Sequence, residues 1–370
     1  MNRRTFLKTM GMLTAASSVD IRALIAAVET RVFAATGAKW YKVLVHSHSR
    51  DFSDGALSAS QVIKTAKKMG YAALIQTDHL KGIYDKGGRT PEAFEKYRRA
   101  FASQDGLIII PGAEIDTATA HILALGDIPY DAELLRLYDQ PNAQQAVIDR
   151  LNQLGLIPVA AHPSAREYLV PKSGKGKLTD WRLDWGQVEG LVGVEIFNDG
   201  DFYSETIQHY VQQALGGANW FVTAGCDQHG VINPALDSRW QRATWVWVEG
   251  SLTKQSLLEA IRQGQTYAAQ GVKLTFLNRP PGQELRLVKW LGLKYDYAFD
   301  KVPKKSWRLR IYRRGKTVDD PMPAGTQPNG FSLREEDTGR KPEGDYRYVV
   351  EFEGKLITSP INLALKYPAE

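Results

Sequence analysis

The 370-residue chain has very little cysteine, little excess charge and no long hydrophobic run. Its single cysteine, Cys226, excludes any disulfide within the chain, so the fold does not depend on internal cross-links. No run approaches the ~20 apolar residues that cross a bilayer as a helix, and we expect no transmembrane segment in the mature protein. The net charge of +6 is too mild to indicate a nucleic-acid partner, because proteins that track phosphates gather many basic residues on one face.

What the chain does have is enough apolar sequence, 43% of its residues, for a globular protein of two domains. Up to about residue 271, apolar runs alternate with helical patterns, which indicates a mostly parallel sheet with crossover helices. The predicted helices cover residues 57–69, 92–101, 143–154, 203–215 and 253–262. Ser58 and Gln61 form a predicted capping box, and Asn142 and Thr253 are predicted to begin two later helices.

From residue 272 the pattern changes to short alternating or aromatic-rich runs, such as 274–276, 307–312 and 346–352. Turn sequences separate these runs, and the pattern predicts a small antiparallel β-domain of sandwich type. Two interpretations of this domain remain open. It either only covers the first domain, or it binds carbohydrate or another component of the cell envelope.

The most informative stretch is residues 46–55, between a predicted strand (residues 41–45) and the first predicted helix. Side chains two apart in a strand point the same way, so His46 and His48 can face one ion together. Asp54 returns from the loop to offer an oxygen nearby. His-x-His at a strand end is a common ligand pattern, although a polar loop with incidental histidines would look the same.

The other histidines and acidic residues of interest also stand at the ends of apolar runs. The residues concerned are His79, Glu114, His121, His162, Asp227 and His229. Loops that follow strands gather at one mouth of an α/β barrel, so these side chains are expected to meet there. Mixed imidazole and carboxylate ligands suit zinc, manganese or iron, and the sequence does not choose between them. Cys226 is interpreted as a small buried residue, not a ligand.

These motifs, in this order, resemble the polymerase and histidinol phosphatase (PHP) superfamily. The resemblance covers about residues 41–270 and implies a distorted (β/α)7 TIM-like barrel that carries two or three divalent metal ions at its mouth. It implies a first ion held by His46, His48, Glu114 and Asp227, a second held by Glu114, His121 and His162, and a third held by Asp54, His79 and His229. Glu114, Asp227 and His229 would act in catalysis through a metal-bound water. Asp78, beside His79, would orient a ligand histidine or cap the strand end.

The first eight residues resemble a twin-arginine export signal, with Arg3 and Arg4 followed by Phe6, Leu7 and Lys8. We therefore expect a signal segment at residues 1–34, a barrel at 35–271 and a β-domain at 272–370. A basic amphipathic N-terminal helix is the alternative. The twin-arginine machinery exports folded proteins, so the expected location is periplasmic or extracellular.

Substrate contacts are predicted from basic residues close to these motifs. Arg50 lies within the first motif, and Arg166 and Lys172 follow His162. The glycine- and lysine-rich loop at residues 172–177 would close over an anion as a lid, or it is only a solvated basic turn.

Taken together, the sequence predicts an exported metal-dependent hydrolase, a phosphoesterase acting on a small phosphorylated substrate. Parts of the C-terminal region resemble the exported, carbaryl-hydrolase-like branch of the superfamily. An ester, carbamate or amide hydrolase is therefore the main alternative. A non-catalytic envelope binding protein is the third.

Overall fold

The computed structural model describes residues 38–365, with several gaps. The gaps are 88–89, 118–119, 139, 164–166, 170–176, 180–187, 199–200, 203, 230–240, 271–280, 282–283, 288–292, 296–306, 314–315, 323–330, 334–343 and 353–354. The predicted signal segment and the run 274–276 lie outside the described residues.

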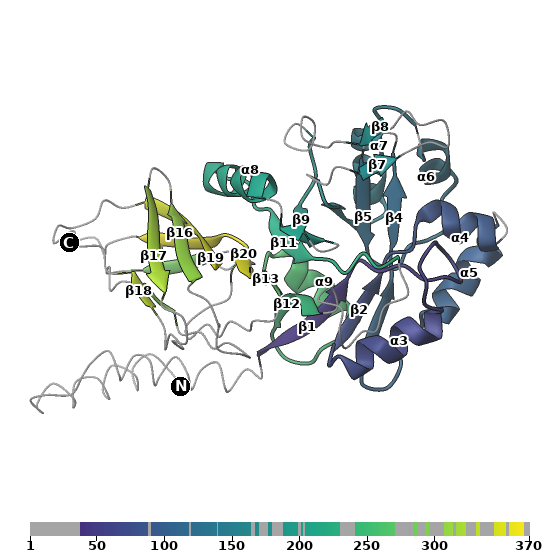
Figure 1. Ribbon diagram of the computed structural model, residues 1–370, viewed down its shortest axis with the longest axis horizontal. Helices are drawn as coiled ribbons and strands as arrows, with labels where there is room; N and C mark the ends of the chain where they lie inside the picture. Colours follow the sequence, from purple (N-terminus) through teal and green to yellow (C-terminus); the bar gives the residue numbers. More distant parts are fainter. Residues whose placement is uncertain are drawn as a thin grey trace, which may run out of the picture.

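The strands of the first 270 residues form two sheet regions (Figure 1). In one, β1 (Lys39–Val45), β2 (Ala73–Gln76) and β3 (Ile108–Pro111) are parallel. On the other side of β1 follow β12 (Arg242–Val248) and β13 (Thr266–Gln270), both in antiparallel pairing. The second sheet contains β4 (Ala113–Asp116), β5 (His121–Leu125), β6 (Ile157–Ala160), β9 (Gly193–Asn198) and β11 (Phe221–Ala224), with β10 (Asp201–Phe202) at its edge.

The two sheets meet at two isolated parallel bridges, Val45 with Gly225 and His79 with Glu114. Gly112 separates β3 from β4, and a Cβ there would lie 2.4 Å from the Ala124 carbonyl oxygen, so only glycine fits where the chain crosses between sheets. The predicted α/β class is confirmed. No closed barrel is found among the described residues, in which two antiparallel strand pairs, β4–β5 and β5–β6, interrupt the parallel order. The distorted (β/α)7 barrel and the sandwich form of the C-terminal domain stay predictions.

Most of the helices lie on the outside of the strands, whereas α9 packs into the core between the sheets (Figure 1). They are α3 (Ala59–Lys68), α4 (Leu80–Gly87), α5 (Pro91–Ala100), α6 (Ala132–Leu137), α7 (Gln144–Gln153), α8 (Ser204–Gly216) and α9 (Lys254–Arg262). The predicted capping box of Ser58 and Gln61 is confirmed, and Thr253 caps α9 as predicted. Asn142 is not an N-cap: it takes φ 57°, and Ala143 occupies that position. None of the described helices is long and apolar enough to span a membrane.

Alternation along the strands separates two hydrophobic cores. Val43 and Val45 belong to a core between the two sheets, whereas Leu44 faces the helices. The inner core also receives Leu257 and Ile261 from α9. Because the inner core is filled by apolar side chains, the polar residues that follow the strands collect just beyond it.

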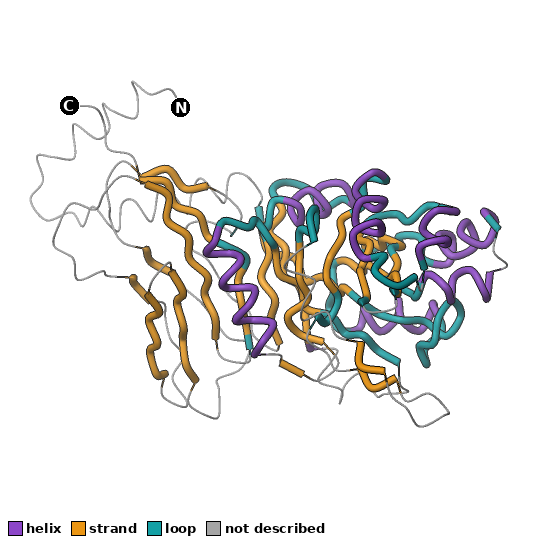
Figure 2. The backbone as a smooth tube through the Cα atoms, turned by 90° about the horizontal axis from the view of Figure 1, so that it is seen from above, coloured by secondary structure: helices purple, strands orange, loops and turns teal. Residues whose placement is uncertain are grey.

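The C-terminal strands continue the first sheet beyond β13, with α8 lying beside them (Figures 1 and 2). They are β14 (Glu284–Leu287), β16 (Trp307–Arg313), β17 (Lys316–Met322), β19 (Gly344–Phe352), β20 (Leu356–Thr358) and β21 (Ile361–Leu365). Two small pairs lie apart from this sheet, β15 (Leu293–Tyr295) with β18 (Phe331–Leu333) and β7 (Glu167–Leu169) with β8 (Lys177–Thr179). The predicted antiparallel strands at 307–312 and 346–352 are confirmed, but their sheet is continuous with that of β1.

The connection between the two regions runs through β20, which pairs with both β13 and β19. Just after β20, the Ser359 hydroxyl accepts a hydrogen bond from the Val222 amide at 3.1 Å and lies 2.7 Å from the Thr266 hydroxyl. The Tyr210 hydroxyl donates to the Thr358 carbonyl at 2.9 Å. Residues 356–361 therefore pack directly against β11 and β13.

Candidate metal centre

The nine side chains predicted as ligands lie together at the ends of the strands. Their donor atoms form three groups that share members, each with all of its atoms within 4.8 Å of one another. The groups are His46, His48, Glu114 and Asp227; Glu114, His121 and His162; and His48, Asp54, His79 and His229. The structure thus brings together residues that are up to 183 positions apart in the chain, from His46 to His229.

The first group is buried and closely spaced. The distances that join the Nε2 atoms of His46 and His48 to each other and to the nearest oxygens of Glu114 and Asp227 are 2.9–3.3 Å. Four ligands arranged tetrahedrally about a zinc ion, with bonds of about 2.0–2.2 Å, are separated by about 3.3–3.6 Å, close to the upper end of these distances. Two imidazole nitrogens facing each other at 3.3 Å repel unless a proton or a cation lies between them. The donor set and its spacing therefore fit a divalent transition metal.

Glu114 connects the first group to the second. Its Oε2 faces His46 and His48, whereas its Oε1 lies 2.9 Å from Nδ1 of His121 and 3.2 Å from Nε2 of His162. Glu114 is the second residue of β4, directly after the crossing from one sheet to the other. This position puts one carboxylate between histidines from both sheets, as a ligand bridging two ions requires.

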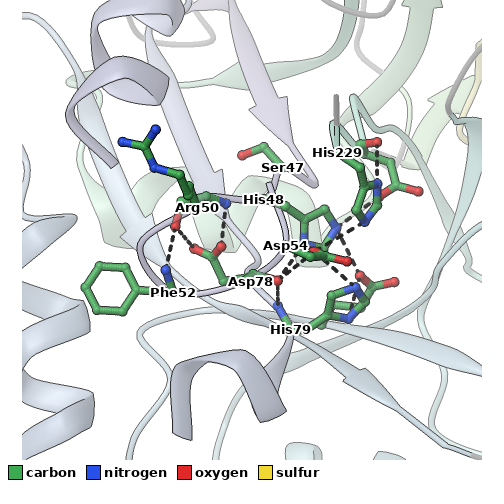
Figure 3. Close-up of polar contacts among 12 residues, drawn as sticks. Ser47, His48, Arg50, Phe52, Asp54, Asp78, His79 and His229 are labelled. Atoms are coloured by element: carbon green, nitrogen blue, oxygen red, sulfur yellow. Dashed lines mark hydrogen bonds and ion pairs between the residues drawn. The ribbon is translucent and has the colours of Figure 1, made fainter. Parts of the chain in front are cut away.

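The third group is wider, and two of its members are exposed; Figure 3 shows His48, Asp54, His79 and His229 close to one another. Oδ1 of Asp54 lies 3.5 Å from Nε2 of His229 and 3.8 Å from Nε2 of His79. The Asp54 side chain is 60% exposed and that of His229 is 40% exposed, in contrast to the buried first group. The cluster is therefore accessible from the side of Asp54 and His229.

Three of the clustered residues have left-handed backbones, namely His46 at φ 64°, His162 at φ 28° and Asp227 at φ 42°. Such conformations cost about 1–3 kcal/mol each in non-glycine residues and persist where surrounding contacts impose them. The amide groups of Cys226 and Asp227 both donate to the His46 carbonyl, at 3.0 and 2.9 Å, so these two strained turns hold each other. We interpret these strained conformations as a requirement of bringing the clustered side chains together, not of packing the core.

Opposite charges dominate the electrostatics of the cluster. Burial alone lowers the pKa of His48, but Asp227 and Glu114 outweigh it and raise that pKa to about 10. Burial likewise opposes ionisation of Asp227 and Glu114, yet the neighbouring histidines hold the pKa of both carboxyls well below the usual range. The carboxylates are thus ionised and favour a positive charge in their midst, which protons or metal ions can supply.

Hydrogen bonds to Asp78 fix the loop that follows His48. The Asp78 carboxylate accepts hydrogen bonds from the Ser49 amide at 2.5 Å, the Ser49 hydroxyl at 3.1 Å and the Gln76 amide at 2.9 Å. Burial raises the pKa of Asp78 to about 6, against the lowering effect of His48 and these hydrogen bonds. Of the two roles predicted for Asp78, these contacts favour the strand-end cap. Lys86 closes the same loop by donating to the carbonyls of Arg50 and Ser53.

Two acidic residues of the site, Asp116 and Glu195, were not predicted from the sequence. Oδ1 of Asp116 lies 2.8 Å from Nδ1 of His79 and 3.4 Å from Nε2 of His121. Glu195, in the middle of β9, is fully buried and receives a hydrogen bond of 2.9 Å from His46. Asp116 had a detectable signal, because it stands two residues after Glu114 in one strand and so shares its face.

Of the three predicted substrate contacts, only Arg50 is among the described residues, and its side chain is not turned toward the cluster (Figure 3). Arg166 and Lys172, with the loop at 172–177 that was predicted as a lid or a basic turn, have no described side chains. Cys226 is fully buried, as its interpretation as a small core residue requires.

Comparison with known proteins agrees with this site. The family model for the PHP domain matches residues 45–168, which contain seven of the nine clustered residues. This match supports the PHP superfamily, whose members are generally metal-dependent hydrolases. No curated protein matches the chain.

Proposed function

We propose that the protein is a metal-dependent hydrolase, specifically a phosphoesterase acting on a small phosphomonoester or phosphodiester. The observation that carries the proposal is Glu114, whose two oxygens face separate groups of imidazole donors. Paired divalent ions about 3.5–4 Å apart supply a nucleophilic hydroxide near neutral pH and stabilise charge on phosphoryl oxygens. Zinc, manganese and iron all suit this donor set.

The clustered residues differ in exposure, and the roles proposed for them follow from that difference. Buried His46, His48 and Asp227 hold their donor atoms in place without solvent competition. Asp54 and His229 stand at the open side, where a substrate in solution arrives first. An anionic substrate is favoured there, because bound divalent ions would leave the open side with excess positive charge.

The finer parts of the proposal come from the sequence. We infer that the mature protein is exported through the twin-arginine machinery to the periplasm or beyond, from the pattern of residues 3–8. We also infer the carbaryl-hydrolase-like branch and the boundaries 1–34, 35–271 and 272–370. In this arrangement the C-terminal strands support the first domain, as the packing of residues 356–361 suggests.

The test is an assay of metal-loaded protein on p-nitrophenyl phosphate, bis-p-nitrophenyl phosphate and naphthyl acetate. We expect hydrolysis of a phosphoester that a chelator abolishes and that added zinc or manganese restores. Glu114→Gln should lose this activity, whereas His209→Gln, a histidine of α8 outside the cluster, should keep it. Hydrolysis of the carbon ester alone would overturn the phosphoesterase assignment, and metal binding without any turnover would favour the binding protein.

A further inference from the structure

Glu195 is a fully buried acidic residue in β9, a strand whose residues are all buried. Both of its carboxylate oxygens are engaged: Oε1 lies 2.9 Å from Nδ1 of His46, and Oε2 accepts hydrogen bonds from the His162 amide at 2.9 Å and the Asn198 side chain at 2.8 Å. Its only ion pair within the described ranges is with His46. A buried carboxylate without a lysine or arginine partner is costly, which indicates a role beyond packing.

The contact with His46 fixes which ring nitrogen carries the proton. The other oxygen of Glu195 already accepts two hydrogen bonds, so the side chain acts as an acceptor and Nδ1 of His46 is assigned as the donor to Oε1. The neutral ring then has its lone pair on Nε2, the atom that lies 3.1 Å from Glu114 and 3.3 Å from Asp227. Metal-binding histidines characteristically donate their second nitrogen to a carboxylate in this way, which fixes the tautomer and makes the ligand more basic.

The same carboxylate also contacts the other segments that build the cluster. Through Oε2 it holds the amide of His162, a residue in the strained left-handed region. A Cβ at Gly225 would lie only 1.7 Å from Oε1, so the segment leading to Asp227 approaches Glu195 as closely as glycine allows. One side chain from β9 thus lies against segments that supply donors to both the first and the second groups.

We propose that Glu195 is a positioning residue of the metal centre. It presents Nε2 of His46 to the first ion and fixes the backbone from which His162 reaches the second. This inference rests on the metal site of the proposed function, but it concerns affinity and protonation, not the reaction catalysed.

The test is Glu195→Gln, which keeps the shape of the side chain. The amide oxygen can still accept from the His162 amide and from Asn198, but the amide nitrogen then faces Nδ1 of His46 and cannot accept its proton. We expect zinc affinity at the first ion to fall about 10–100-fold, while the ion at Asp54, His79 and His229 binds as before. Zinc titration against a competing chelator resolves these equivalents.

Asp131→Asn is the matched control. Asp131 is also a buried carboxylate, but it caps α6 and pairs with Arg150 at 2.5 Å, away from the cluster. This variant should lower the melting temperature and leave zinc affinity unchanged, which separates a general loss of stability from a loss of ligand positioning.

A second measurement needs no variant that might misfold. In zinc-loaded wild-type protein, nitrogen NMR of the imidazoles should find the proton of His46 on Nδ1 and the metal on Nε2. The reverse assignment, or zinc binding by Glu195→Gln with unchanged affinity and stoichiometry, would overturn the inference. Failure of the wild-type protein to bind zinc at all would instead defeat the metal site itself, and this inference with it.

Discussion

Zinc binding to the metal-free protein should strengthen steeply with pH, because protons occupy the donor atoms first. Burial lowers the pKa of His48, but Asp227 and Glu114 raise it to about 10, against about 6.5 for an exposed histidine. At neutral pH the metal-free ring is therefore protonated, and an ion must displace that proton before it can bind. The burial and charges around His46 raise its pKa as well.

The expected magnitude follows from this displacement. Each proton released changes the apparent affinity tenfold per pH unit, or about 1.4 kcal/mol. His48 alone predicts about a 100-fold gain in zinc affinity between about pH 6.5 and about pH 8.5, and a proton released from His46 makes the slope steeper. The gain should level off only as the pH approaches the folded pKa of His48.

The stability of the metal-free protein should move in the opposite direction. A group with a raised pKa in the folded state stabilises the fold fully below its unfolded pKa, and this contribution disappears as the pH rises through the folded value. For His48 the loss therefore extends from about pH 6.5 to about pH 10. Zinc replaces the proton, so the melting temperature of the loaded protein should change less across that interval.

The assay is a chelator-competition titration at constant ionic strength, with calorimetry in two buffers of different ionisation enthalpy to count the protons released. His209→Gln is the control, because this histidine lies in α8 and its pKa is lowered by partial burial. The variant should reproduce the wild-type slope. Zinc affinity that is flat with pH, or binding without proton release, would refute the electrostatic description of the cluster.

Three substitutions test other parts of the site. His162→Ala should remove an equivalent of bound metal and most turnover, measured by elemental analysis and assay; full occupancy with unchanged activity would contradict a second ion there. Asp78→Asn places an amide nitrogen against hydrogen-bond donors of the first loop and should lower the free energy of unfolding by about 1–3 kcal/mol in denaturant titrations, whereas an unchanged midpoint would exclude the cap role. Gly225→Ala inserts a Cβ into a carboxylate and should reduce zinc affinity, while Gly216→Ala, which meets nothing within 4 Å, should not.

The sequence predicted the gathering of the site well, because the rule is local. All of the nine residues except Asp54, which lies in a loop, stand near an apolar run, and strand ends in an α/β fold meet at one edge. His46 and His48 do face one site, but not through the strand period of two on which the prediction rested, because β1 ends at Val45 and His46 is left-handed. Whether each residue binds a metal remains a prediction that loading experiments must test.

The parts that the sequence missed depend on contacts between distant segments. Glu195 lies within an apolar run, and only the fold shows that this run passes beneath His46 and His162. The arrangement in two sheets was missed for a similar reason: the crossing at Gly112 carries β4 into a separate sheet, and no local pattern marks strand partners, while the distorted barrel itself stays a prediction. The change in composition near residue 272 likewise gave no sign that the C-terminal strands continue the sheet of β13.

The packing of residues 356–361 against β11 and β13 sets an order of events during synthesis. The ribosome makes every clustered donor, from His46 to His229, more than 120 residues before it makes Ser359. Until then the Val222 amide and the Thr266 hydroxyl lack the partner that they have in the finished fold. A nascent chain therefore carries all its candidate ion-binding groups before it contains β20, the strand that packs against β13 and is followed by the hydroxyl that bonds to β11.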